Sequence, residues 1–236
     1  MSKQKIAAFS VARYACIALI AVGCSGLSRL DHTDRLGRVA SRAVYTNGVL
    51  RGAEEIRYVG ESARPLSITF RCLERDALKP SREAYHEYTE AGMLVRIRYT
   101  IVVDGEKIPC GSAQYAYGAG NTLRRITYTA LSDTVRRRTY PSGVQMFEYS
   151  GGRVAARRII EYAYNRKTNA VMQIGQHAIS YHNAAPALLQ SWVLDPETGV
   201  IVRTRETNGT ALRERITRIE TALAAAASGV HFTCTN

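Results

Sequence analysis

The clearest alternation of hydrophobic and polar residues in this chain lies at residues 94–103. Hydrophobic residues occupy every second position there, namely Val95, Ile97, Tyr99, Ile101 and Val103. The intervening positions are largely polar, and a period of two is typical of a strand that buries one face. Asp104-Gly105 follows at once and favours a tight turn, so the pattern predicts a hairpin.

A short unit recurs through the middle of the chain: an aromatic pair, a turn with glycine, and an apolar strand. The copies are Tyr85 and Tyr88 before Gly92, Tyr115 and Tyr117 before Gly120, Phe147 and Tyr149 before Gly152, and Tyr162 and Tyr164 before a polar turn at 165–169. Each hairpin is too small to bury its apolar face alone, so neighbours must stack into one sheet. We therefore expect a mainly β fold, an antiparallel meander forming a twisted open sheet or a half-barrel.

Three segments interrupt this rhythm. Residues 25–44 predict a polar tether followed by a short helix, because Leu36, Val39, Ala40 and Ala43 share one helical face. Residues 73–84 are charged, include Pro80, and are predicted to form a loop. Residues 175–191 contain scattered glycine, histidine and proline, and suggest a longer excursion covering one end of the sheet.

The C-terminal segment supports two structures. A turn at Asn208-Gly209 would make a hairpin with Arg203 opposite Glu214 and Ile201 opposite Ile216. The spacing of Leu212, Ile216, Ile219 and Leu223 is instead that of a helix. We expect a strand to about residue 217 and a short helix after it.

The N-terminus has the features of an export signal. Lys3 and Lys5 precede an apolar run at residues 14–22 that is too short for an ordinary membrane span. The next residues, Ala21-Val22-Gly23-Cys24-Ser25, resemble the lipobox of bacterial lipoproteins. The resemblance implies that the mature chain begins at an acylated Cys24 and that Ser25 directs it to the outer membrane, facing the periplasm or the cell surface. The alternatives are an ordinary secretory signal that leaves a soluble protein, and an uncleaved anchor.

These features divide the chain into a signal peptide at 1–23, a lipid-anchored tether with a short helix at 24–44, and an antiparallel β domain at 45–236. An oxidising compartment would permit one disulfide among the remaining cysteines, Cys72, Cys110 and Cys234. We expect Cys72–Cys110, because both residues end apolar strand-like segments. Three buried thiols are the alternative.

The formal charge of +12 favours anionic partners such as lipid headgroups or phosphorylated polysaccharide. Because the arginines are dispersed along the predicted strands, most should belong to a solvated face. An exported protein rarely meets nucleic acid, so we expect no nucleic-acid partner.

Residues that could carry chemistry are sparse. His177 and His182, with Tyr181 and Trp192 nearby, form the one local cluster, which is either a metal or small-ligand site or a set of ordinary loop residues. There is no Gly-x-Ser-x-Gly and no glycine-rich phosphate loop before a lysine. We therefore expect no enzyme, no cofactor, no metal and no catalytic residues.

The aromatic-x-aromatic unit with its glycine turn resembles the YD repeats of Rhs-type and teneurin-type proteins. The likeness covers roughly residues 85–170 and 192–218, although the aspartate of those repeats is replaced by Thr89, Gly118, Ser150 and Asn165. It implies a non-enzymatic envelope lipoprotein, a binding or structural module that meets another envelope protein, anionic lipid or polysaccharide. In architecture the expected fold is also similar to the lipoprotein carriers LolA and LolB, which implies the alternative of a lipid or lipoprotein carrier with a hydrophobic concavity.

Overall fold

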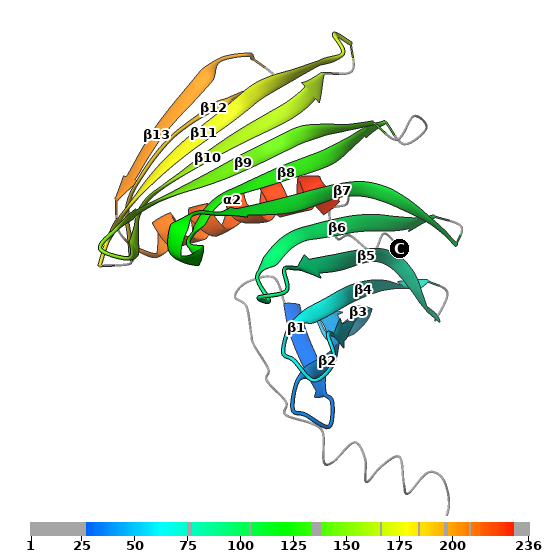
Figure 1. The fold of residues 1–236 in the computed structure, drawn as a ribbon. Helices are drawn as coiled ribbons and strands as arrows, with labels where there is room; N and C mark the ends of the chain where they lie inside the picture. Colours follow the sequence, from blue (N-terminus) through cyan, green and yellow to red (C-terminus); the bar gives the residue numbers. More distant parts are fainter. Residues whose placement is uncertain are drawn as a thin grey trace, which may run out of the picture. The chain divides into compact units, whose positions relative to one another are not determined.

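The structure is a computed structural model that describes residues 27–74, 77–103, 105–133, 138–165, 167–183, 185–195, 198–207 and 209–228. The strands are β1 (Leu27–Thr33), β2 (Val39–Thr46), β3 (Val49–Tyr58), β4 (Pro65–Glu74), β5 (Ala77–Tyr88), β6 (Leu94–Val103), β7 (Glu106–Tyr117), β8 (Leu123–Asp133), β9 (Arg138–Ser150), β10 (Arg153–Asn165), β11 (Ala170–His182), β12 (Ala185–Leu194) and β13 (Ile201–Thr207) (Figure 1). A 3₁₀ turn, η1 (Ala119–Asn121), separates β7 from β8, and the helix α2 (Thr210–Ser228) follows β13.

The strands follow one another in the sheet in the order of the sequence, from β1 to β13, without a crossover. Neighbouring strands pair antiparallel, as in β2–β3, β8–β9 and β12–β13. The predicted mainly β fold, an antiparallel meander, is confirmed. This topology needs only short connections, because antiparallel neighbours are joined by tight turns.

The turns use residues that tolerate a left-handed backbone. Asn47 and Gly48 join β2 to β3 at φ of 51° and 77°, and Gly151 and Gly152 join β9 to β10 at 57° and 75°. Glycine has no Cβ to clash in this region and asparagine tolerates it, so both promote tight hairpin turns. The turn expected at Gly152 is therefore confirmed.

The structure gives the second tyrosine of an aromatic pair a specific role. Tyr117 at the end of β7 donates its hydroxyl to the Leu94 carbonyl oxygen at the start of β6, at 2.8 Å. Tyr149 at the end of β9 donates in the same way to Leu123 at the start of β8, at 2.9 Å. Tyr58 ends β3 and donates to Val39 at the start of β2, at 2.8 Å. We call these three bonds the tyrosine clamps, since each fastens a strand end to the preceding strand.

By its internal contacts the chain forms two compact units. Among the described residues, unit 1 comprises 27–86 and 101–107, and unit 2 comprises 87–100 and 108–228. Each unit is considered by itself below.

Ion pairs connect neighbouring strands of unit 1. Arg42 on β2 bonds Asp31 on β1 at 2.6 Å and Glu54 on β3 at 3.4 Å, so one guanidinium links three strands. The hydrogen bond from Arg42 lowers the pKa of the Asp31 carboxyl. Each such partly exposed pair contributes about 1 kcal/mol or less, so unit 1 depends on several of them together with its backbone ladder.

Two predictions within unit 1 are wrong. The helix expected within residues 24–44 is replaced by β1 and β2, joined by a turn in which the Asp34 carboxylate accepts from the Leu36 and Arg38 amides at 2.8 and 3.0 Å. The loop expected at 73–84 is the end of β4 and most of β5. Pro80 lies at a register shift in this pair, where the ladder tolerates a residue without an N–H.

Unit 2 has one hydrophobic core between its sheet and α2. On the strands Ile159, Ile179 and Leu189 are at most 1% exposed. From α2 come Leu212, Ile216, Ile219, Leu223 and Ala227. Ile97 and Tyr99 of β6 pack against this core, as their alternation predicted. The helix packs on β8, β9 and β12, and we call the sheet face beneath it the inner face and the opposite one the outer face.

The C-terminal prediction was half right. The strand expected up to about residue 217 is absent, because α2 begins at Thr210 and runs to Ser228. Arg203 is therefore not opposite Glu214, nor Ile201 opposite Ile216. The helical spacing in this segment is the pattern that holds: it gives α2 a continuous apolar stripe for the inner face.

The excursion expected at residues 175–191 is also wrong. This segment is a regular hairpin of β11 and β12 that turns at Asn183, whose φ is 48°. Every second residue faces the core, so His177 and Ile179 are buried while their neighbours are not. Polar residues had obscured an ordinary strand alternation.

Two glycines let α2 lie close to the sheet. A Cβ added at Gly111 on β7 would overlap the carbonyl oxygens of Ala227 and Thr129. At Gly143 on β9 it would overlap the Leu223 side chain. Because these positions have no side chain, the helix can pack closely against the strands. Among the described residues, no helix has the length and hydrophobicity needed to cross a membrane.

We predict that Gly111→Ala destabilises the protein by about 1–3 kcal/mol, because the added methyl group meets rigid backbone and must push α2 away. The measurement is urea-induced unfolding. Gly175→Ala is the matched control, since its Cβ would make only ordinary contacts at 3.5 Å. Equal stability of the two variants would contradict this account of helix packing.

Candidate functional site

The outer face of unit 2 carries arginines in a line across the strands. Arg125 on β8 and Arg158 on β10 both stand opposite Met146 on β9. Arg158 then continues through Ala178 and Gln190 to Arg205 on β13. These three arginines are exposed, and we call them the arginine row. The row is set by register, because residues opposite one another on adjacent strands share a face.

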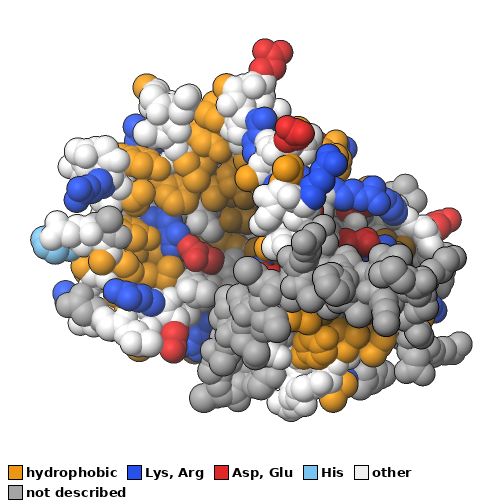
Figure 2. Space-filling model, turned by 90° about the horizontal axis from the view of Figure 1, so that it is seen from below, with side chains coloured by type: hydrophobic (Ala, Val, Ile, Leu, Met, Phe, Trp, Pro, Cys, Tyr) orange, Lys and Arg blue, Asp and Glu red, His pale blue; other side chains and the backbone are white. Residues whose placement is uncertain are grey.

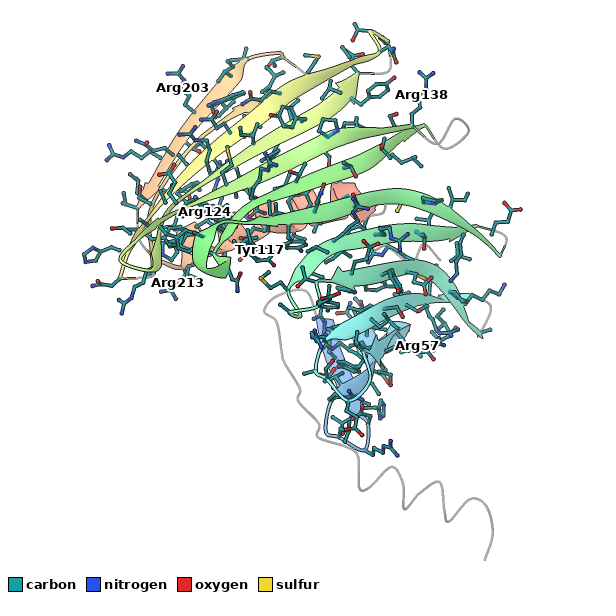
Figure 3. The ribbon with its side chains drawn as sticks, viewed as in Figure 1. Arg57, Tyr117, Arg124, Arg138, Arg203 and Arg213 are labelled. Carbon is teal, nitrogen blue, oxygen red and sulfur yellow. The ribbon has the colours of Figure 1, made fainter. Side chains whose placement is uncertain are left out.

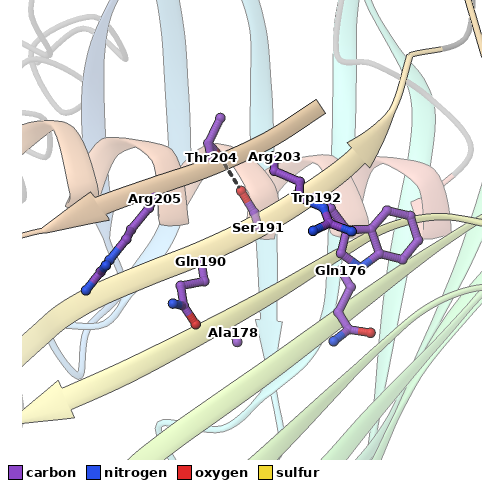
Figure 4. A pocket seen from close by; sticks show the side chains of 8 residues that line it. All are labelled: Gln176, Ala178, Gln190, Ser191, Trp192, Arg203, Thr204 and Arg205. Carbon is purple, nitrogen blue, oxygen red and sulfur yellow. Dashed lines mark hydrogen bonds between the residues drawn. The ribbon is translucent and has the colours of Figure 1, made fainter. Parts of the chain in front are cut away.

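A pocket of about 470 Å³ lies at the β13 end of this row, around Trp192. Gln176, Trp192 and Arg203 stand opposite one another on β11, β12 and β13. Gln190 and Arg205 extend the lining along the next row. In Figure 4 the Arg203 guanidinium lies beside the indole of Trp192, with Gln176 near the same ring. We call this the Trp192 pocket.

The strands that carry the pocket are fastened from the other side. The Ser191 and Thr204 hydroxyls are hydrogen-bonded at 2.6 Å, and together they tie β12 to β13 (Figure 4). Ser191 is 7% exposed and stands opposite buried His177, on the inner face. The pocket is therefore built on a paired, rigid part of the sheet rather than on a loop.

The two arginines of the pocket are not engaged within the protein. Among the described residues, neither Arg203 nor Arg205 has an ion-pair or hydrogen-bond partner, whereas Arg215 nearby on α2 is paired with Glu206. Other exposed arginines of unit 2 come from separate elements: Arg124 from β8, Arg138 from β9 and Arg213 from α2 (Figure 3). The expectation of dispersed arginines thus holds for these positions, while the arginine row and Arg203 gather on one face.

The chemistry of the Trp192 pocket is that of recognition. An indole offers a flat apolar face, glutamine amides both donate and accept, and a guanidinium binds oxyanions through a fork of N–H donors. This combination can hold a polar ring that carries acidic groups.

The inner face contains a second, polar cavity of about 450 Å³ beside α2. His177 is 2% exposed, and its Nε2 lies 3.1 Å from Glu161 Oε1. Its Nδ1 is buried without a hydrogen-bond partner. Leaving such a group unsatisfied costs roughly 1–3 kcal/mol, so its environment calls for an explanation.

Deeper in the core Arg157 is 9% exposed and pairs with Glu220, so the middle of α2 is tied to β10 by an ion pair. Nearby, burial raises the pKa of the Tyr128 hydroxyl far above its ordinary value, and Gln145 donates to that oxygen at 3.1 Å. These groups serve the fold rather than a binding site.

The structure bears on one of the two predictions made for cysteines, the Cys72–Cys110 disulfide. Cys24 lies outside the described residues. The Cys72–Cys110 disulfide is wrong: Cys72 is disulfide-bonded, but Cys110 is a buried thiol. Its sulfur lies against the end of α2 and donates to the Ser228 carbonyl oxygen at 3.0 Å, so it is directed toward the helix.

The histidine cluster suggested by the sequence is split by the sheet. His177 points to the inner face, whereas Trp192 belongs to the outer pocket. His182 ends β11 and is exposed, with Asn183 Nδ2 at 3.3 Å from its Nε2. No group of three or more metal-binding side chains occurs in the described part of the chain. Sequence reasoning did not predict the Trp192 pocket, because the expected hairpin paired Arg203 with Glu214.

Comparison with known proteins adds likeness in fold only. No family model matches the chain. No curated protein matches it either. Among solved structures, a protein of unknown function from Bacteroides fragilis is 11% identical with a TM-score of 0.37, over 53% of this chain and 91% of that one.

Two DUF3836 family proteins match as well. The one from Bacteroides vulgatus is 13% identical with a TM-score of 0.31, over 40% of this chain and 91% of its own. The one from Parabacteroides distasonis is 10% identical with a TM-score of 0.29, over 42% and 92%. At such TM-scores the function has to be argued from this chain's own residues.

We predict that Arg203→Gln and Arg205→Gln each change the free energy of unfolding by no more than about 0.5 kcal/mol, because these exposed side chains have no partner to lose. Urea-induced unfolding measures this change. Arg42→Gln is the comparison, since it removes a guanidinium that links three strands and should cost more. A large loss at Arg203 or Arg205 would mean that the pocket arginines are structural.

Proposed function

We propose that this chain is a non-enzymatic, lipid-anchored binding module of a bacterial cell envelope. Its outer face in unit 2 holds an acidic polysaccharide of that envelope. The hairpins of the repeated aromatic unit supply the rigid platform, and the arginine row and the Trp192 pocket supply the contacts.

One observation supports this proposal most: the Trp192 pocket combines a half-buried indole with two exposed arginines that have no partner among the described residues. Exposed unpaired arginines cost little in stability but keep their charge available to an anion. The adjacent strands place Arg158 and Arg125 further along the same face. With strands roughly 4.8 Å apart, the row extends over more than 20 Å, which suits an elongated polymer better than a small ion.

The anchoring part of the proposal rests on the sequence. Cys24 follows a cationic start and a short apolar run, and the first strand begins only three residues later, at Leu27. An acyl chain gains roughly 0.8 kcal/mol for each buried CH₂, so several chains on one cysteine would hold the protein at a membrane.

The rival function, a lipid carrier, is less well supported. A carrier needs an apolar cavity, but the inner face of unit 2 is occupied by the chain's own helix. Hydrophobic side chains do remain visible in patches on the face seen in Figure 2, interspersed with charged ones. Acyl chains could enter unit 2 only if α2 moved aside, and lipid found on the purified protein by native mass spectrometry would favour that function.

We predict that polygalacturonate, an acidic polysaccharide, changes the tryptophan fluorescence of the protein, whereas neutral dextran does not. Trp192 is the only tryptophan, so the signal reports on the pocket alone. Arg203→Gln with Arg205→Gln should weaken binding at least about tenfold, because two charge-assisted contacts are lost. Binding should also weaken as salt is added.

The control for this experiment is Arg138→Gln with Arg213→Gln, which removes the same charge from exposed positions outside the pocket. An equal loss of affinity in both double variants would mean that binding follows net charge alone, which would contradict a binding role for the Trp192 pocket. Binding to anionic vesicles without binding to the polysaccharide would replace the proposed partner with a membrane surface.

We predict that cells expressing the wild-type chain incorporate labelled palmitate into it and that Cys24→Ala abolishes the incorporation, because Cys24 would be the acylated residue. Labelling is read from the immunoprecipitated protein. Cys16→Ala is the matched control and should still be labelled, since Cys16 lies inside the predicted signal. Equal labelling of wild type and Cys24→Ala would end the lipoprotein proposal.

A further inference from the structure

We infer that the cavity between α2 and the inner face of unit 2 binds a small oxyanion, a molecule that carries a carboxylate or a phosphate group. The cavity has a volume of about 450 Å³ and is lined by polar groups from two directions. Glu161 and His177 face it from the sheet, and Arg215 and Arg218 face it from the helix. This inference does not depend on the polysaccharide proposal, which concerns the outer face.

His177 is the unusual member of this cavity. The ring is almost completely buried, at 2% exposure, and is held by Glu161 Oε1 at 3.1 Å from Nε2. The other nitrogen, Nδ1, has no hydrogen-bond partner in the structure. Buried polar atoms in proteins are almost always paired, so an unpaired ring nitrogen beside a polar cavity indicates a partner from outside the chain.

The two arginines differ in what they can offer. Arg215 is already paired with Glu206 at the end of β13. Arg218 has no ion-pair or hydrogen-bond partner among the described residues, although it lines the cavity. An arginine presents its N–H donors in a planar fork that matches carboxylate and phosphate oxygens. Arg218 is therefore the residue that would receive the anion.

Charged groups of both signs surround the cavity. Arg215 and Arg218 come from the helix, and Glu206 and Glu161 come from the sheet. The strands on either side face His177 with uncharged Ile159 and Ser191. Arg157 and Glu220, the other charges on β10 and α2, pair with each other. An oxyanion would therefore meet Arg218, which has no ion-pair partner among the described residues, and Nδ1 of His177 is the buried polar atom left for a second contact with the ligand.

The remaining lining residues are apolar and could contact the carbon skeleton of an organic acid. Val193 from β12 and Ile219 from α2 border the polar groups. Such a border would contact the carbon skeleton of a ligand whose acidic group meets Arg218. The cavity is large enough for a small metabolite and lies at the lower end of the usual range for ligand pockets.

The test is titration of the purified full-length chain with inorganic phosphate, and separately with citrate, against chloride at equal ionic strength. We expect saturable binding of at least one of the two by calorimetry. In Arg218→Gln the affinity should fall at least about tenfold. Arg213→Gln is the matched control: it removes the same charge from the same helix at an exposed position outside the cavity.

A second readout separates a specific site from general charge screening. ¹⁵N NMR of the imidazole should show the His177 Nδ1 resonance shifting as the ligand binds, because this nitrogen has no hydrogen-bond partner in the structure. Binding of phosphate alone or of citrate alone would assign the acidic group and support the site. Equal affinities of the two variants, or a His177 ring that does not respond at saturating anion, would overturn it and leave the cavity to water.

Discussion

The fit of α2 onto the inner face is the contact on which unit 2 depends. A strand meander of this kind has an apolar face that water would otherwise reach, and burying apolar surface is the main source of folding free energy. The helix supplies five of the eleven residues of the buried cluster. It can do so because Gly111 and Gly143 leave no side chain in its path. Close approach, rather than bulk hydrophobicity, therefore sets where the helix lies.

Covering the inner face has a consequence for the outer one. Because side chains alternate along a strand, the neighbours of a residue that points toward the helix point toward the solvent. On β10 this places Ile159 inside and Arg158 outside, and on β12 it places Leu189 inside and Gln190 outside. Pairing of strands in register then lines these outward residues up across the sheet. The arginine row is in this sense a product of core packing, although its charge is free to serve binding.

The same helix also places charged groups at the inner face. Arg215, Arg218 and Glu220 lie on α2 among its apolar residues, and they meet Glu206, the His177–Glu161 pair and Arg157. Charges so close to a core must be paired or hydrated, since removing them from water without a partner is costly. Arg157 pairs with Glu220, although its Nε and one Nη remain buried without a partner, as does His177 Nδ1. His177 and Arg218 line the polar cavity whereas Arg157 does not, and this position separates the candidate site from the ion pair.

Local patterning in the sequence was enough to establish the class of fold. The alternation at 94–103 and the glycine and asparagine turns are set by side-chain period and backbone strain, which act over a few residues. Tyr117 and Tyr149, the second tyrosines of two of the repeated units, form tyrosine clamps, whereas the sequence indicated only cross-strand packing. Where a segment was polar or mixed, as at 73–84 and 175–191, local pattern misled, because register with a neighbouring strand outweighs weak local preference.

The sequence by itself did not determine which distant residues share one face of the sheet. Residues 210–228 fit a strand or a helix by pattern, and only the presence of an apolar sheet to cover decides for the helix. Because this segment is a helix, Arg203 does not pair with Glu214, and Cys110 lies at the end of α2. For the same reason Arg218 lines the same cavity as His177. Such juxtapositions depend on tertiary packing, since the free energy that fixes them comes from surfaces far apart in the chain.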